Sequence, residues 1–261
     1  MVQIRVTRFC RREFERDVYR PGVVSMTRIV WGSLGAGLLL FVAAGLSQRL
    51  HVAVLLPPLA ASCFIGGNTI YLRVARPKQV IVGHFVSAVG GVLGVWVGEA
   101  IAGGGNLAAA TKLGVAVLFA AALMQACDAD HPPAAATAAI PAILPMPVAW
   151  WLLPAHMAWG AVLVVVGSAL WNRIWTECPA PEPETPRAWL GLNMEKSDIA
   201  GTAVCCLGFL LMCFSRLSEP VYLAGVVVIT AGTVFLAFDH LPRAQWIRTQ
   251  TSLENGGKGG R

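Results

Sequence analysis

The chain has 261 residues, of which 56% are hydrophobic and only 13% are charged, and its mean hydropathy is +0.63. Water-soluble domains carry roughly 25% charged residues, so this composition excludes a disordered chain and argues against a single soluble globule. The formal net charge of +6 comes from 20 Lys and Arg residues against 14 Asp and Glu residues. The sequence therefore predicts an all-α fold, a polytopic bundle of transmembrane helices.

A basic arm, residues 1–28, precedes the first apolar stretch. It contains seven arginines together with Glu13, Glu15 and Asp17. Such an arm favours contact with anionic lipid on the cytoplasmic side over binding of nucleic acid. The apolar stretch that follows is longer than that of a cleaved signal peptide, so we expect it to remain as a span.

Eight uncharged stretches are long enough to approach the length of a membrane crossing, which takes about 20 apolar residues. Buried helices of a soluble protein are the alternative, but so many stretches in one chain argue against it. Prolines 145, 147 and 154 divide the longest uncharged run into two, although 132–152 alternatively forms a re-entrant segment. The expected spans are 29–48, 51–72, 80–101, 107–127, 132–152, 157–174, 198–215 and 220–238.

The basic residues predict the orientation of these spans. With eight crossings, 17 of the 20 Lys and Arg residues lie on the side of the two termini. Because Lys and Arg are retained in the cytoplasm, we expect both termini there, in a bacterial-type inner (plasma) membrane. A re-entrant 132–152 segment would reduce the bias to a 10:10 split, which favours a true crossing.

Composition divides the chain into further parts. After the basic arm, residues 29–175 form a six-span membrane domain, and 176–197 form a cytoplasmic linker rich in Pro and Glu. Residues 198–238 form a two-span hairpin, and 239–261 form a basic, partly disordered tail. The seven cysteines contain no Cys-x-x-Cys pair, and we interpret them as apolar packing residues without a zinc site or disulfide framework.

Glycines recur at helical spacing inside two spans. Gly90, Gly94 and Gly98 are four residues apart, and Gly225 and Gly232 are seven apart. A helix face without side chains lets a neighbouring helix approach closely, so the spacing predicts helix packing. Alternatively, these glycines line a narrow permeation path.

Two segments 75 residues apart resemble each other. Pro57-Pro58-Leu59-Ala60-Ala61-Ser62 opens the second expected span, and Pro132-Pro133-Ala134-Ala135-Ala136-Thr137 opens the fifth. Three crossings separate the copies, so they have opposite orientations in the membrane. This pattern is typical of a 3+3 inverted repeat, with chance similarity in an Ala- and Pro-rich chain as the alternative.

The chemistry of these segments indicates an anion site. Proline suits the first turn of a helix, and the small residues after it leave main-chain amides accessible at the positive end of the helix dipole. Broken helices are tolerated at membrane depth only beside protein or a water-filled cavity. We therefore expect two facing half-helices between the repeats to bind a small anion. The candidate binding residues are Pro58, Ala60, Ala61, Ser62, His84, His131, Pro132, Pro133, Ala135, Ala136 and Thr137.

Four of the titratable residues in or near the spans are candidates for coupling or capping. His84 and His131 titrate near neutral pH and can link anion binding to protons, although a neutral histidine bound to a carbonyl is an equally ordinary role. Asp130 is expected to be solvated, to cap a helix or to couple protons. Lys78 is expected to attract anions at the cytoplasmic side.

The same residues resemble a known family. Asp130-His-Pro-Pro-Ala-Ala-Ala-Thr-Ala138 is similar to the signature of the HPP family of integral membrane proteins, which is named after its His-Pro-Pro motif. Ala75-Arg-Pro-Lys-Gln-Val-Ile-Val-Gly-His84 resembles a second family run, Gln-Pro-Arg-Asn-Val-Ile-Gly-Gly-His, with Arg76, Lys78 and Val82 departing from it. Ala60-Ala61-Ser62 resembles a Gly-Ala-Ser segment of the family. The resemblance covers residues 28–175 and leaves 176–261 unassigned.

The resemblance implies a membrane protein, and the association of plant chloroplast members with nitrite transport implies nitrite or a similar anion. We therefore expect a transporter or facilitator of a small monovalent anion, with the bilayer and the anion as partners. We expect no enzyme activity, cofactor, metal or nucleic acid, and a homo-oligomer is left open. A non-transporting sensor or scaffold is the alternative, and an intramembrane enzyme is disfavoured because no nucleophile or metal motif is present.

Overall fold

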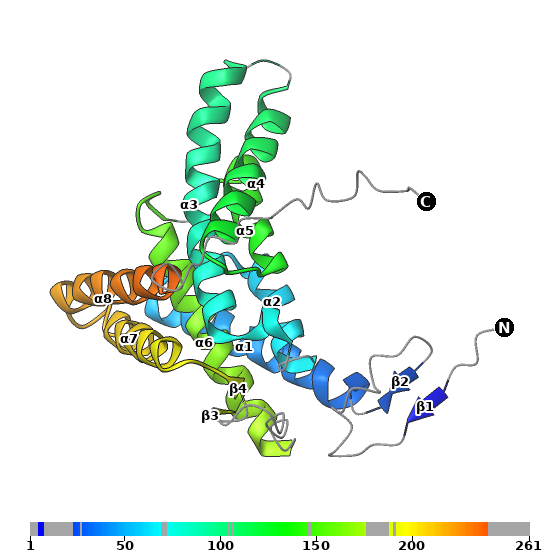
Figure 1. The fold of residues 1–261 in the computed structure, drawn as a ribbon. Coiled ribbons are helices and arrows are strands. Elements are labelled where there is room, and N and C mark those ends of the chain that lie inside the picture. The colour runs from blue at the N-terminus through cyan, green and yellow to red at the C-terminus, as the bar shows by residue number, and fades with distance from the viewer. Residues whose placement is uncertain are drawn as a thin grey trace, which may run out of the picture.

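The structure is a computed structural model that describes residues 5–7, 23–26, 28–68, 72–103, 105, 107–145, 148–175, 188–189 and 192–239. The fold is all-α, as predicted. Its α-helices are α1 Ser33–Leu50, α2 Leu56–Asn68, α3 Pro77–Ala102, α4 Ala108–Ala126, α5 Ala135–Ile143, α6 Leu153–Trp175, α7 Lys196–Met212 and α8 Glu219–Phe238 (Figure 1). The π-helical turn η2 Arg28–Gly32 leads into α1, and the single 3₁₀ turns η3 Arg73–Ala75 and η4 Pro132–Ala134 precede α3 and α5.

Two short strand pairs accompany the helices. Strand β1, Arg5–Thr7, pairs in parallel with β2, Val23–Ser25. Strand β3, Ala188–Trp189, pairs antiparallel with β4, Leu192–Asn193. The rest of the predicted arm 1–28, most of the predicted linker 176–197 and the tail from residue 240 lie outside the described residues.

Five of the described helical segments are long and apolar enough to cross a membrane. They are Arg28–Leu50, Pro77–Ala102, Ala108–Ala126, Leu153–Ile174 and Glu219–Phe238. Each coincides with a predicted span. The 17-residue helix α7 occupies the remaining long span position, beside α8.

Helices α2 and α5 are shorter than the predicted spans 51–72 and 132–152. Their 13 and 9 residues make helices only about 20 Å and about 14 Å long, at 1.5 Å per residue. Proline explains the boundaries: α2 holds one Pro-Pro pair in its first turn, and α5 directly follows the turn η4 that holds the other. Helix α5 ends because Leu144, which precedes Pro145, adopts an extended conformation. These two elements are therefore the broken helices of the bundle.

The extended residues before α2 find hydrogen-bond partners on other parts of the protein. The Ser47 hydroxyl donates to the Val52 carbonyl oxygen at 2.8 Å, and His156 Nδ1 donates to the Ala53 carbonyl oxygen at 2.9 Å. The Leu55 amide donates to the Met157 sulfur at 3.3 Å. Non-helical backbone is tolerated at membrane depth when protein groups satisfy it in this way.

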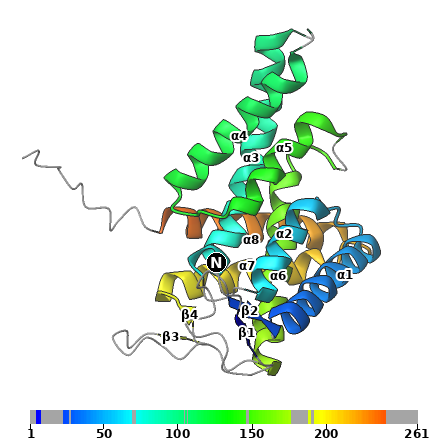
Figure 2. The same ribbon diagram turned by 90° about the vertical axis from the view of Figure 1, so that its right-hand side faces the viewer.

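The two halves of the six-helix region interlock. Helix α3 packs on α4, α5 and α6, while α6 packs on α1, α2 and α3. Each half thus places its long third helix against the first two helices of the other half, as the views in Figures 1 and 2 show. An inverted repeat produces this exchange of partners, and the repeat itself stays a prediction.

The glycine faces confirm the predicted helix packing. A Cβ atom on Gly90 would lie 2.7 Å from the Ala120 nitrogen, and one on Gly98 would lie 2.7 Å from the Lys112 Cα atom. Main-chain atoms of α4 thus occupy the space that side chains on α3 would need. Gly225 and Gly232 of α8 make similarly close approaches to Met212 and Cys205 of α7.

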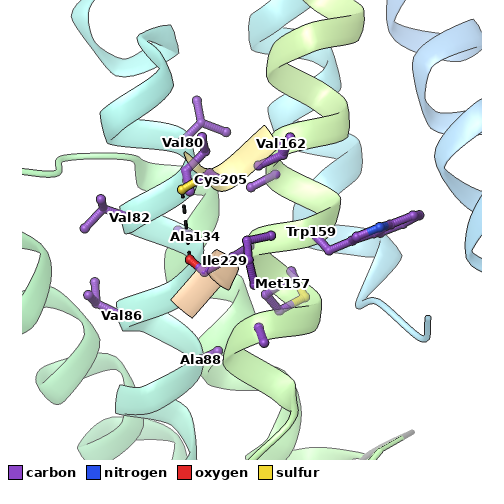
Figure 3. Packing of buried hydrophobic residues seen from close by; sticks show 14 of the residues in the cluster. Val80, Val82, Val86, Ala88, Ala134, Met157, Trp159, Val162, Cys205 and Ile229 are labelled. Carbon is purple, nitrogen blue, oxygen red and sulfur yellow. Dashed lines mark hydrogen bonds between the residues drawn. The ribbon is translucent and has the colours of Figure 1, made fainter. Parts of the chain in front are cut away.

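A continuous apolar core ties the C-terminal hairpin α7–α8 to the six-helix region. Buried side chains from α3, α6, α7 and α8 meet in it, as Figure 3 shows for Val80, Val162, Cys205 and Ile229. Trp159 of α6 is fully buried, and its ring stacks on Phe209 of α7 with centroids 5.1 Å apart. Cys205 donates to the Ile229 carbonyl oxygen within this core, which fits the predicted packing role of the cysteines.

Candidate functional site

Four buried polar side chains meet where α2, α3, η4 and α5 come together. Ser62 lies on α2, His84 on α3, His131 immediately before η4, and Thr137 on α5. None of them is more than 2% exposed. We call these four residues the polar cluster. Because their neighbours are mostly apolar, the cluster is a polar island inside the bundle.

The cluster is linked by a continuous series of hydrogen bonds. Thr137 Oγ1 lies 2.9 Å from His84 Nδ1, and His84 Nε2 lies 2.7 Å from Ser62 Oγ. Ser62 Oγ in turn lies 2.8 Å from His131 Nε2. His131 Nδ1 ends the series at the Val74 carbonyl oxygen, 2.7 Å away. All four imidazole nitrogens therefore have a partner.

The protons of this series can be assigned by elimination when both rings are neutral. A carbonyl oxygen only accepts, so His131 Nδ1 carries a proton and His131 Nε2 can only accept. The Ser62 hydroxyl donates to this nitrogen at 2.8 Å in preference to the Pro58 carbonyl oxygen at 3.2 Å. Ser62 has then used its single proton, so His84 Nε2 donates to it. The remaining nitrogen, His84 Nδ1, accepts from Thr137. Every hydrogen bond of the series is therefore donated in the same direction, from Thr137 at one end toward the Val74 carbonyl at the other.

The neutral state of His131 follows from its surroundings. His131 is fully buried, and its two ring nitrogens contact uncharged groups, the Ser62 hydroxyl and the Val74 carbonyl. No opposite charge at these contacts offsets the cost of burying an imidazolium, so the uncharged ring is the resting form.

Local sequence explains why His131 enters the cluster. Asp128 has a left-handed backbone conformation, φ 49°, which Asp tolerates better than most residues, and it turns the chain after α4. Arg73 forms an ion pair with the Asp128 carboxylate. Gly83 leaves room for the histidine, because a Cβ atom there would lie 2.8 Å from His131 Cβ.

The broken helices bring Ser62 and Thr137 to the same place. Ser62 follows Pro58 by one helical turn, and the Pro58 carbonyl oxygen, 3.2 Å from Ser62 Oγ, is a competing acceptor for its proton. Helix α5 approaches α3 closely because Gly91 has no side chain: a Cβ atom there would lie 2.8 Å from Ala138 Cα. His84 thus bridges the two segments that resemble each other in sequence.

Other predicted site residues lie outside the hydrogen-bonded cluster. Ala61, Pro132 and Ala136 are exposed, while Ala60, Pro133 and Ala135 are half-buried beside it. Asp130 accepts from Gln125 Nε2 at 2.6 Å and does not cap η4, which has no side-chain cap. Lys78 is buried in the first turn of α3, two turns before His84.

One participant in the polar cluster and one buried polar residue of α3 were not predicted from the sequence. The Val74 carbonyl fixes the proton position of His131, but every residue has a carbonyl, so no sequence signal identifies it. Gln79 is buried next to Lys78, and its Oε1 atom has no hydrogen-bond partner. The sequence feature that points to Gln79 is its place in the motif that ends at His84.

Comparison with known proteins identifies the family. The family model described as "HPP, transmembrane region" matches residues 21–181, which is more than half of the chain and includes the whole polar cluster. No curated protein and no solved structure matches the chain. The matched region contains both broken helices and the His-Pro-Pro motif that supplies His131. On this basis the chain belongs to the HPP family of integral membrane proteins.

Proposed function

We propose that the protein is a transporter or facilitator of a small monovalent anion, with nitrite as the first candidate. The observation that supports this best is the polar cluster, because polar and ionisable groups inside a membrane bundle are costly and mark substrate or proton pathways. The cluster also joins the two broken helices, α2 and α5, which is where transporters built from repeats bind their substrates.

The proposed binding groups are those at the beginnings of the broken helices. Main-chain amides after Pro58 and Pro133, the small residues Ala60, Ala61, Ala135 and Ala136, and the hydroxyls of Ser62 and Thr137 would surround the anion. Lys78 would raise the local anion concentration. Such a site needs no buried cationic side chain in direct contact with its ligand.

Nitrite uptake by the full chain in proteoliposomes tests the proposal. Replacement of Thr137 by valine keeps the shape of the side chain but removes its hydroxyl, so uptake is expected to fall roughly tenfold or more, the effect of losing a hydrogen bond to a charged group. Thr137→Ser should retain most uptake because the hydroxyl remains.

Thr233→Val is the matched control for that experiment. Thr233 is a buried helical threonine whose hydroxyl donates to the Ile229 carbonyl oxygen of its own helix, far from the proposed anion site in the sequence. This variant should transport nitrite like the parent. Equal uptake by Thr137→Val and the parent, or no uptake by the parent above protein-free vesicles, would contradict the proposal.

A non-transporting sensor or scaffold is the second candidate. The observation that favours it is the hairpin α7–α8, which lies beyond the family match and yet packs against α3 and α6. This role predicts a protein partner and no anion flux. The same vesicle assay therefore separates the two candidates. Either role is a non-enzymatic one, in keeping with a family defined by its transmembrane region.

We further propose that both termini lie in the cytoplasm of a bacterial-type inner membrane. The proximity of several charges supports the eight-crossing order, because Asp198 at the start of α7 interacts electrostatically with Lys78, Arg76, Asp239 and Asp128. With eight crossings, the loops and helix ends that contain these residues all lie on the same side of the membrane. Helix α2 is long enough to cross the hydrocarbon core of the membrane when its preceding extended residues 52–55 are counted, since extended chain covers about 3.3 Å per residue.

Site-directed labelling tests this orientation. A tag at the C-terminus should be accessible only from the cytoplasmic face, whereas Gly105→Cys, in the exposed connection between α3 and α4, should react with an impermeant thiol reagent only from the opposite face. Labelling of both positions from one face would disprove the eight-crossing order.

A further inference from the structure

We propose that the polar cluster couples one proton to the movement of each anion, through a reversal of all its hydrogen bonds. The inference rests on the proposed function and adds to it the coupling ion and the stoichiometry. It follows from the contacts of the cluster, because the Val74 carbonyl can only accept and because the Ser62 proton goes to His131 Nε2, 2.8 Å away, instead of the more distant Pro58 carbonyl oxygen.

In the neutral state, Thr137 has no proton to offer an anion. Its hydroxyl proton is donated to His84 Nδ1, because His84 Nε2 must donate to Ser62. The Thr137 oxygen therefore presents only lone pairs to any ligand. An anion that approaches this hydroxyl is repelled in the resting state of the cluster.

One added proton reverses the series. Thr137 takes the proton from an incoming acid, such as hydronium or the conjugate acid of the anion, and gives its own proton to His84 Nδ1. His84 gives its Nε2 proton to Ser62, and Ser62 gives its proton to His131 Nε2. Four O–H or N–H bonds form and four break, counting the bond of the incoming acid. The net change is one proton, carried as a positive charge on His131.

The reversed state binds an anion where the resting state did not. His131 now donates to both Ser62 and Val74, Ser62 donates to His84, and His84 donates from Nδ1 to Thr137. The Thr137 hydroxyl accepts that bond, so its proton is free to turn toward an anion. The imidazolium charge and the anion attract each other. Protonation of the cluster therefore strengthens anion binding, and a bound anion strengthens protonation by the same factor.

Within the polar cluster the two histidines interact electrostatically with each other, whereas nearby charged side chains are paired outside it. His84 is affected electrostatically by His131, whose ring centroid is 5.2 Å away. Arg73 is paired with Asp128, and Asp130 with Gln125, both at exposed positions. The same elements also carry Cys63 of α2, Lys78 of α3 and Cys127 after α4. Glu99 of α3 and Lys112 of α4 form an ion pair with each other.

Anion accumulation in proteoliposomes under a proton gradient tests the coupling. With the membrane potential clamped at zero, an inward proton gradient of one pH unit should accelerate nitrite uptake, with about tenfold accumulation as the limit if one proton moves with each anion. Because nitrous acid that diffuses through lipid approaches the same limit, initial rates are compared and the rate in protein-free vesicles is subtracted. Ser62→Ala interrupts the series at its centre, so its gradient-driven rate should fall to the protein-free level, whereas Thr233→Val should match the parent.

The outcomes separate this inference from the proposed function. Nitrite flux that follows the membrane potential and ignores the proton gradient would overturn the coupling and leave anion transport standing. No protein-dependent nitrite flux under either driving force would overturn the proposed function. A gradient-driven initial rate of Ser62→Ala equal to that of the parent would also overturn the relay.

Histidine NMR of the isotope-labelled full chain in bilayers provides a second test that does not depend on a variant that folds. Without nitrite at neutral pH, His84 should carry its proton on Nε2 and His131 on Nδ1. With saturating nitrite at acidic pH, His84 should change to the Nδ1–H form and His131 should carry both protons. Unchanged ring signals under those conditions, in protein that transports nitrite, would overturn the proposal.

Discussion

Replacement of Ser62 by alanine is expected to reduce the stability of the protein strongly, in addition to its effect on transport. The Ser62 hydroxyl is the partner of two buried imidazole nitrogens, His84 Nε2 and His131 Nε2. Its removal leaves a donor and an acceptor unpaired, and each buried unpaired group costs about 1–3 kcal/mol. A carbonyl oxygen cannot replace the hydroxyl for His131 Nε2, because that nitrogen accepts in the neutral ring and a carbonyl has no proton to donate.

Thermal unfolding of the purified protein in detergent measures this loss. Ser47→Ala is the matched control, because Ser47 is also a buried serine but donates only to the Val52 carbonyl oxygen. That variant should lose about 1 kcal/mol, the contribution of one ordinary hydrogen bond. If Ser62→Ala unfolds at the same temperature as Ser47→Ala or the parent, the double role of Ser62 is wrong.

Replacement of Gly94 by alanine is expected to disrupt the α3–α4 hairpin. The new Cβ atom would lie 2.5 Å from both the Ala116 nitrogen and the Ala116 Cβ atom. These atoms are fixed to the backbone of α4 and cannot rotate away, so the helices must separate. Overpacking of this kind costs typically about 1–3 kcal/mol, and separation also loosens the contacts at Gly90 and Gly98.

Gly114→Ala is the matched control for Gly94→Ala. Gly114 lies in α4, and a Cβ atom there would have nothing within 4 Å. Alanine forms helix better than glycine by up to about 1 kcal/mol, so this variant should be as stable as the parent or more stable. The two substitutions are chemically identical, and opposite shifts of the unfolding temperature are expected. Equal shifts would show that α3 and α4 do not pack through this face.

The sequence predicted the residues of the polar cluster better than the arrangement of their bonds. Ser62, His84, His131 and Thr137 stood out because they are polar groups in or beside apolar runs, and all four meet. Their mutual hydrogen bonds could not be predicted, because these depend on how α2, α3 and α5 pack. Asp130 stood out for the same reason as His131, yet it binds Gln125 because the turn at Asp128 directs the two side chains differently.

The lengths of α2 and α5 also could not be predicted from the distribution of charged residues alone. An absence of charge marks residues that tolerate lipid, but it does not distinguish helix from extended chain. Proline marked the start of α2 and of the turn η4 that leads into α5, but the predicted end at residue 152 was wrong, because α5 ends at Ile143, two residues before Pro145. The extended residues 52–55 are stabilised by side chains of α6 that lie about a hundred positions further along the chain, so no local pattern indicates them.

His156 links the C-terminal hairpin to the region that matches the family model. Its Nδ1 atom donates to the Ala53 carbonyl, and its Nε2 atom accepts from the Tyr222 hydroxyl of α8 at 2.6 Å. Tyr222 lies outside the matched residues 21–181. A chain cut after residue 181 would lose this hydroxyl and the Phe209 ring that covers Trp159. The region that matches the family model therefore depends on the hairpin for two buried contacts, the Tyr222 hydroxyl behind the His156–Ala53 bond and the Phe209 ring on Trp159.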